Sequence, residues 1–102
     1  MPATYTLDDG AETHREYPET FQIPPRAERE SLRPGDIAKL MFRISVGDQV
    51  HVERMWVQVI DARPEFYIGA LDNDPYCTND IQSGDQVQFH SDHVIQILRK
   101  EA

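Results

Sequence analysis

Residues 40–46 read Leu40-Met41-Phe42-Arg43-Ile44-Ser45-Val46, with a large apolar residue at every even position. Alternation with a period of two predicts a β-strand that buries one face. Gly47-Asp48 follows directly, and this pair favours a tight turn because glycine accepts positive φ and aspartate bonds back to its own backbone. We therefore expect a hairpin whose second strand, long or bent, is the β-former-rich segment 49–60.

Turn signals and short apolar runs continue the strand pattern toward the C-terminus. The segment 61–65 contains Pro64 and should end the second strand, after which residues 66–71 resume an extended pattern. Residues 72–85 are polar and rich in turn formers, which predicts the longest loop of the domain, with room for one helical turn. The last strands are expected at residues 86–90 and 94–97.

The region before residue 37 is more polar. Residues 23–32 predict a short helix with prolines in its opening turn and Pro34-Gly35 as its stop. We expect residues 1–20 to form an N-terminal arm that need not be ordered, and residues 21–102 to form a single small β-rich domain. Short strands joined by turns indicate a mainly β (or α+β) fold: a small curled antiparallel sheet, SH3-like and partly barrel-shaped, with a short N-terminal helix.

The charge of the chain is strongly acidic. Its formal net charge is −8, from 18 Asp and Glu against 10 Lys and Arg. A nucleic-acid or anionic membrane surface is recognised by clustered Lys and Arg, and the sequence has no such cluster. We therefore expect a protein partner, basic in charge, and no nucleic acid or membrane. The sequence shows no signal peptide and no apolar stretch near the roughly 20 residues of a membrane span, so a cytoplasmic location is expected.

No group of residues stands out as catalytic or metal-binding. Cys77 is the only cysteine, which excludes an internal disulfide and a cysteine zinc cluster. His90 and His93 with His51 make a weak case for a metal, since an extended chain points residues three apart to opposite faces. The run at 72–74 resembles the start of a calcium loop, but the sixth position is Cys77 where glycine is required. We expect no enzyme activity, no cofactor and no metal.

Aromatic residues offer the best contact candidates. Trp56, Tyr67 and Tyr76, with Arg54 nearby, include the residue types that anchor protein interfaces most often. Aromatic residues on strands belong to the core more often than to a contact surface, so Trp56 is expected mainly in the core. Tyr76 lies in the polar loop and is the better candidate for an exposed contact.

Four segments in series resemble an uncharacterised bacterial family of domains of unknown function, some of whose relatives are similar to immunity proteins that accompany polymorphic toxins. The segments are Pro-Gly-Asp-Ile-Ala-Lys-Leu at 34–40, Glu-Arg-Met-Trp-Val-Gln-Val at 53–59, Tyr-Ile-Gly-Ala-Leu-Asp-Asn-Asp-Pro at 67–75 and Gly-Asp-Gln-Val-Gln-Phe at 84–89. The resemblance spans roughly residues 21–98. It implies a compact β-rich or α+β domain with a protective binding role, and it carries no catalytic residues.

Charge and resemblance together favour a non-catalytic protein-interaction domain, such as an immunity-type inhibitor that binds a basic toxin. The alternative is a regulatory module that binds a small molecule near Trp56 and the long loop. Exposed strand edges are compatible with a monomer or a weak homodimer. The candidate partner-binding residues are Arg54, Trp56, Asp72, Asn73, Asp74, Tyr76 and Asp80.

Overall fold

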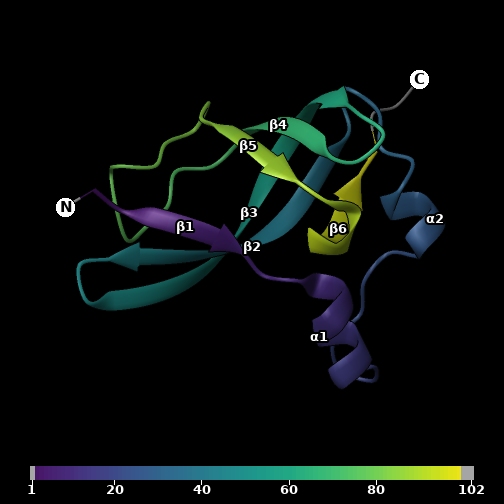
Figure 1. The fold of residues 1–102 in the computed structure, drawn as a ribbon, viewed down its shortest axis with the longest axis horizontal. Coiled ribbons are helices and arrows are strands. Elements are labelled where there is room, and N and C mark those ends of the chain that lie inside the picture. The colour runs from purple at the N-terminus through teal and green to yellow at the C-terminus, as the bar shows by residue number, and fades with distance from the viewer. Residues whose placement is uncertain (1, 100–102) are drawn as a thin grey trace.

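Six strands form one antiparallel sheet that curls into a half-barrel in the computed structural model, which describes residues 2–99 (Figure 1). The order is β1-β2-β3-β4-β5, and β6 also pairs with β2. The elements are β1 (Thr4–Leu7), α1 (Gly10–Glu16), α2 (Arg26–Arg29), β2 (Ile37–Val46), β3 (Gln49–Ala62), β4 (Tyr67–Leu71), β5 (Gln86–Phe89), the 3-10 turn η1 (Ser91–His93) and β6 (Val94–Leu98). The prediction of a mainly β fold with a small curled antiparallel sheet and a short helix near the N-terminus is confirmed.

The β2–β3 hairpin is the centre of the sheet. The two strands pair continuously from Val46↔Gln49 to Ile37↔Gln58, and Gly47 makes the turn with a φ of +61°. Beyond this hairpin β3 continues and pairs with β4, with a register shift near Ile60 that leaves this side chain exposed. The other edge of β2 is shared, because its first half pairs with β6 and its second half with β1. The strand therefore has neighbours on both sides along most of its length.

The first 20 residues, which the sequence marks as an arm, contribute a strand and a helix. Tyr5 and Leu7 alternate with threonines, so β1 can place one face against the sheet, and the Tyr5 ring lies 5.1 Å from that of Phe42. Asp9 caps α1 by accepting a hydrogen bond from the Glu12 N–H at 2.8 Å. The helix packs against η1 and β6. Residues 4–16 are therefore part of the fold.

The second helix is shorter than predicted. The sequence suggests a helix over residues 23–32, but α2 covers only Arg26–Arg29. The chain leaves the helix because Leu32 turns into the core and donates its N–H to the Tyr67 hydroxyl at 3.2 Å. The same hydroxyl donates to the Arg29 carbonyl at 2.9 Å. Tyr67 thus fixes the end of α2 on the sheet.

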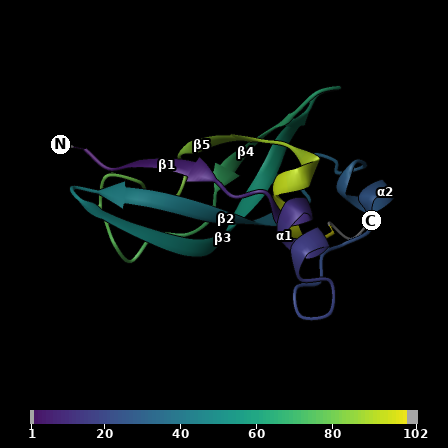
Figure 2. The ribbon, with the colours of Figure 1, turned by 60° about the horizontal axis from the view of Figure 1, so that its bottom comes forward.

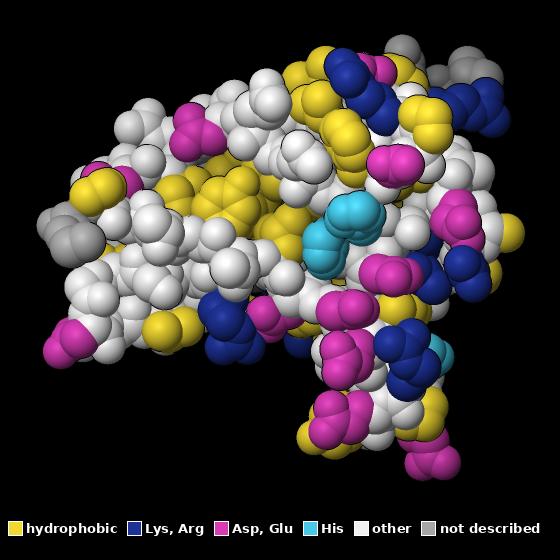
Figure 3. Space-filling view, in the orientation of Figure 1, with side chains coloured by type: hydrophobic (Ala, Val, Ile, Leu, Met, Phe, Trp, Pro, Cys, Tyr) yellow, Lys and Arg dark blue, Asp and Glu magenta, His cyan; other side chains and the backbone are white. Residues whose placement is uncertain are grey.

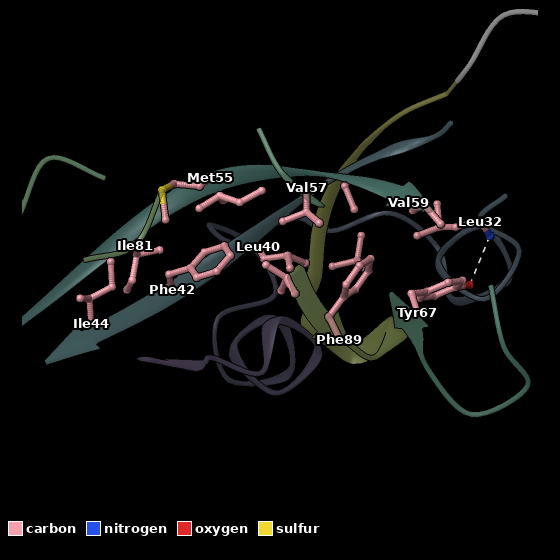
Figure 4. Close-up of a cluster of buried hydrophobic side chains, with 14 residues drawn as sticks. Leu32, Leu40, Phe42, Ile44, Met55, Val57, Val59, Tyr67, Ile81 and Phe89 are labelled. Carbon is pink, nitrogen blue, oxygen red and sulfur yellow. Dashed lines mark hydrogen bonds between the residues drawn. The ribbon is translucent and has the colours of Figure 1, made fainter. Parts of the chain in front are cut away.

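The core fills the concave side of the half-barrel (Figure 4). Phe42 and Phe89 are its largest fully buried side chains, and Ile81 joins it from the long loop. Each such side chain contributes about 1.5–3 kcal/mol when fully buried. Buried core residues of β2, β3 and β5 include Leu40, Phe42, Ile44, Met55, Val57, Val59, Val87 and Phe89.

A Gly-Asp turn occurs twice with the same hydrogen bonds. Gly35 and Gly84 have φ values of 98° and 97°, where a side chain is disfavoured. Their N–H groups donate to the carbonyls of Val59 on β3 and Leu71 on β4, at 2.9 and 2.7 Å. The aspartate that follows each glycine accepts a side-chain hydrogen bond from the backbone N–H three residues earlier. One local device therefore leads the chain into both β2 and β5.

Candidate functional site

The long predicted loop runs from residue 72 to residue 85, between β4 and β5. It contains bends and turns and no helical turn among its residues. In Figures 1 and 2 it extends to the end of the half-barrel where β1 begins and the β2–β3 hairpin closes. Pro75 and Ile81 are buried and hold it against the sheet. Its position at one end of a rigid scaffold is typical of binding loops.

Asn73 joins the start of the loop to β3. Its side-chain oxygen accepts a hydrogen bond from the Trp56 N–H at 2.6 Å. The N–H of Asp72 donates to the Trp56 carbonyl at 2.8 Å. These two bonds extend the contact between the loop and β3 beyond the end of β4. The predicted site residues Trp56, Asp72 and Asn73 are therefore neighbours.

Asp74 and Asp80 close the loop with their side chains. A carboxylate oxygen of Asp74 accepts a hydrogen bond from the Ser83 N–H at 2.9 Å. A carboxylate oxygen of Asp80 accepts one from the N–H of Ala3 at 2.8 Å, which ties the loop to the segment before β1. Both aspartates remain exposed. They therefore stabilise the loop and also place negative charge on its surface.

Glu53, which is not among the predicted partner-binding residues, joins β3 to the loop. Its carboxylate accepts hydrogen bonds from the N–H of Tyr76 at 2.9 and 3.1 Å and from the N–H of Cys77 at 3.1 Å. Partial burial raises the pKa of Glu53, but these donors, the Cys77 thiol and the nearby His51 outweigh burial and leave the pKa lowered. The sequence gives no local signal for this contact, because the partners lie 23 and 24 residues further along the chain.

Tyr76 stands at the tip of the loop and is fully exposed, at 101% of its reference surface. Its backbone is fixed by Glu53 although its ring is free of the core. Asp72, Asp74 and Asp80 are also exposed on the same loop. The loop thus presents an exposed aromatic ring on a hydrogen-bonded backbone, with three exposed aspartates on the same loop. Such pre-organisation lowers the entropy lost on binding a partner.

Arg54 and Trp56 lie on the other face of the sheet. Met55 and Val57 on β3 face the core, so their neighbours in sequence face outward. Trp56 is half-buried on this convex face and not in the core, with the Lys39 ammonium 5.0 Å from its ring. The Arg54 guanidinium lies 5.6 Å from the ring of Phe21. The predicted site is therefore divided, and the hydrogen bonds between Trp56 and the loop are made by the Trp56 backbone.

The open side of the half-barrel exposes apolar surface. Figure 3 shows hydrophobic side chains in a strip between β1 and β5, the two strands at the ends of the sheet order. Tyr5 and Leu7 of β1 are partly buried against the core here. Burial, and then the charge of Asp85, raise the pKa of the Tyr5 hydroxyl. This strip adjoins the 72–85 loop, to which Asp80 ties the start of β1.

The histidine pair turns out to be close in space. η1 brings the rings of His90 and His93 to 5.6 Å, and the His93 Nδ1 accepts a hydrogen bond from the His90 N–H at 2.9 Å. Within residues 2–99 no group of three His, Cys, Asp or Glu is arranged to hold a metal ion. Burial, and then His90, lower the pKa of His93, while Asp9 and Asp92 oppose them. Over the same residues no helix is long and apolar enough to cross a bilayer.

Comparison with known proteins gives one match. Residues 25–98 match the model of a family described as "uncharacterized protein conserved in bacteria" (DUF2314). No curated protein and no solved structure matches the chain. The family region begins just before α2 and ends with β6, so it includes five strands of the sheet and the whole 72–85 loop. The chain belongs to this family of uncharacterized bacterial proteins.

Proposed function

We propose that the protein is a non-catalytic interaction module that binds a basic partner protein through the 72–85 loop. The observation that carries this proposal is the fully exposed Tyr76, whose backbone N–H is held by the Glu53 carboxylate. Tyrosine is among the residues that contribute most to protein interfaces, and a fixed backbone lets its ring bind with little ordering cost.

The charge around the loop favours a basic partner. From Pro64 to Leu98 the chain contains six Asp or Glu and no Lys or Arg. Three of these acids, Asp72, Asp74 and Asp80, are exposed on the same loop as Tyr76. A surface of one sign accelerates association with an oppositely charged protein and disfavours like-charged partners.

The specific form that we propose is an immunity-type inhibitor of a basic toxin such as a nuclease. A nuclease site that holds phosphates is rich in Lys and Arg, and an acidic loop can occupy it in place of the nucleic acid. The four sequence segments resemble an uncharacterised bacterial family, some of whose relatives are similar to immunity proteins, and this motivates the choice. The apolar strip beside β1 and β5 supplies hydrophobic surface next to the acidic loop (Figure 3).

The purified protein can be used to capture partners from native cell extract at low and at high salt, which tests the proposal. The affinity of the captured protein is then measured. Tyr76→Ala should weaken binding about 30-fold or more if this ring is an interface anchor. Asp72→Asn with Asp74→Asn keeps side-chain acceptors in the loop and removes two charges, so it should slow association and reduce its salt dependence.

Two control variants separate the loop from general effects. Glu12→Gln with Glu16→Gln removes the same charge from exposed positions on α1, and Tyr17→Ala removes another exposed tyrosine, at 54% of its reference surface. Both should bind like the unaltered protein. Binding that survives high salt and is equally strong in the loop variants and the controls would refute the proposed surface.

A further inference from the structure

A second surface feature lies on the convex face, away from the exposed side of the 72–85 loop. A shallow groove of about 280 Å³ is formed where the segment before α2 crosses β2, β3 and β6. None of its lining residues is acidic, although the chain as a whole carries a net charge of −8. The lining residues are Thr20, Phe21, Gln22, Lys39, Arg54, Ile95 and Gln96.

Two cations face this groove from neighbouring strands. In the β2–β3 register Lys39 is opposite Trp56 and Met41 is opposite Arg54, so Lys39 and Arg54 are diagonal neighbours on one face. Five other arginines of the described chain form ion pairs with carboxylates. Among residues 2–99, Lys39 and Arg54 form none. Arg15 and Arg33 form none either, but only Lys39 and Arg54 line this groove together, so its wall carries two positive charges without a carboxylate partner among the described residues.

Aromatic rings support both cations. Lys39 lies over Trp56 and Arg54 lies over Phe21, at 5.0 and 5.6 Å from the ring centres. Such contacts hold the charged groups by attraction to the ring face without neutralising them. A guanidinium that lies over a ring can still offer its N–H donors to a planar or tetrahedral oxyanion. The rings therefore position the Lys39 ammonium and the Arg54 guanidinium without neutralising their positive charge.

We propose that this groove binds the oxyanion group, a carboxylate or a phosphate, of a small metabolite. Arg54 would supply a paired set of N–H donors and Lys39 a point charge, while the amide of Gln96 adds a further donor and acceptor at the wall. The volume lies just below the usual range for small-molecule sites, which is about 300–1,000 Å³, so the ligand is compact. Phe21 and Ile95 give it an apolar wall. This site is independent of the proposed protein interaction.

Trp56 gives the site a direct optical readout, since it is the only tryptophan of the chain and lies beside Lys39. We would titrate the protein with sodium phosphate and, separately, with sodium succinate, and follow Trp56 fluorescence against sodium chloride at equal ionic strength. A saturable change with one of the two anions is expected, and which one saturates at lower concentration distinguishes phosphate from carboxylate ligands. The indole N–H resonance of Trp56 in a nitrogen-15 correlation spectrum gives an independent readout.

Matched variants test the two cations. Arg54→Gln should weaken anion binding about tenfold or more, because it removes a charge-assisted donor, and Lys39→Gln should do the same in the resonance measurement. Arg33→Gln changes the net charge equally at an exposed position outside the groove, and should leave binding unchanged. The proposal is wrong if neither anion gives a saturable change beyond chloride, or if Arg33→Gln weakens binding as much as Arg54→Gln.

Discussion

Replacement of Asn73 by alanine tests whether the loop is held as the structure indicates. The substitution removes the acceptor of the 2.6 Å hydrogen bond from the Trp56 N–H and leaves that partly buried donor without its partner. An unsatisfied donor of this kind costs about 1–2 kcal/mol when its site is only partly buried. In a domain of this size the loss corresponds to a fall in Tm of about 4–16 °C. Thermal unfolding followed by circular dichroism measures it.

Two companion variants make the result specific to this hydrogen bond. Asn73→Asp keeps an oxygen acceptor of the same shape, so it should retain most of the stability, with some repulsion from the flanking aspartates that salt relieves. The Asp72 carboxylate forms no hydrogen bond within residues 2–99, so Asp72→Ala should lower the free energy of unfolding by about 0.5 kcal/mol at most. Equal Tm values for Asn73→Ala and Asp72→Ala would contradict the assigned role of Asn73.

Three further variants or conditions address the sheet, the thiol and the histidine pair. Gly69→Ala should lower the free energy of unfolding, measured in urea, by about 1–3 kcal/mol, because a Cβ at this position would lie 2.7 Å from the backbone oxygen of Gln58. Unchanged stability would show that β3 and β4 pack less closely at Gly69 than the structure indicates. Burial, with Glu53 adding to it, raises the pKa of the Cys77 thiol, so alkylation by iodoacetamide should reach half its maximal rate at a higher pH than in a peptide thiol. The pKa of His93 is lowered in the folded protein, so the unfolded state binds more protons near that pKa. The free energy of unfolding should therefore be at its full value above the ordinary histidine pKa of about 6.5 and should decline as the pH falls through it. The decline between about pH 7.5 and 5.5 should be smaller in His93→Asn, and an equal decline would exclude His93 as its source.

The strands could be predicted where apolar and polar residues alternate regularly along the segment. In the segment 40–46, Leu40, Phe42 and Ile44 are buried as the alternation predicts and Val46 is partly buried, while Met41 is buried as well. In β3 the pattern is ambiguous, because the even residues Val50 and Val52 are apolar but exposed, whereas the odd residues Met55 and Val57 are buried. Only the pairing of β3 with β2 settles which side is inside, and it places Met55 opposite Leu40. For this reason the orientation of Trp56 could not be read from its own strand.

The remaining differences between the sequence predictions and the structure arise from contacts between residues that are distant in sequence. The strand β1 is short, and two of its four residues are threonine. Its stability depends on pairing with residues 42–45, which lie far along the chain. The candidate loop was identified correctly as long, polar and turn-rich, and the exposure of Tyr76 followed from that composition. The role of Glu53 depends on the return of the chain 23 residues later, which no local pattern encodes.

The hydrogen bond from Ala3 to Asp80 also determines where a fusion or tag would emerge. Ala3 lies against the 72–85 loop, whereas β6 ends at the opposite end of the half-barrel (Figure 1). An N-terminal affinity tag would therefore compete sterically with a partner at the acidic loop. Attachment through the C-terminus keeps that loop accessible, and a comparison of the two orientations reports which end of the molecule the partner covers.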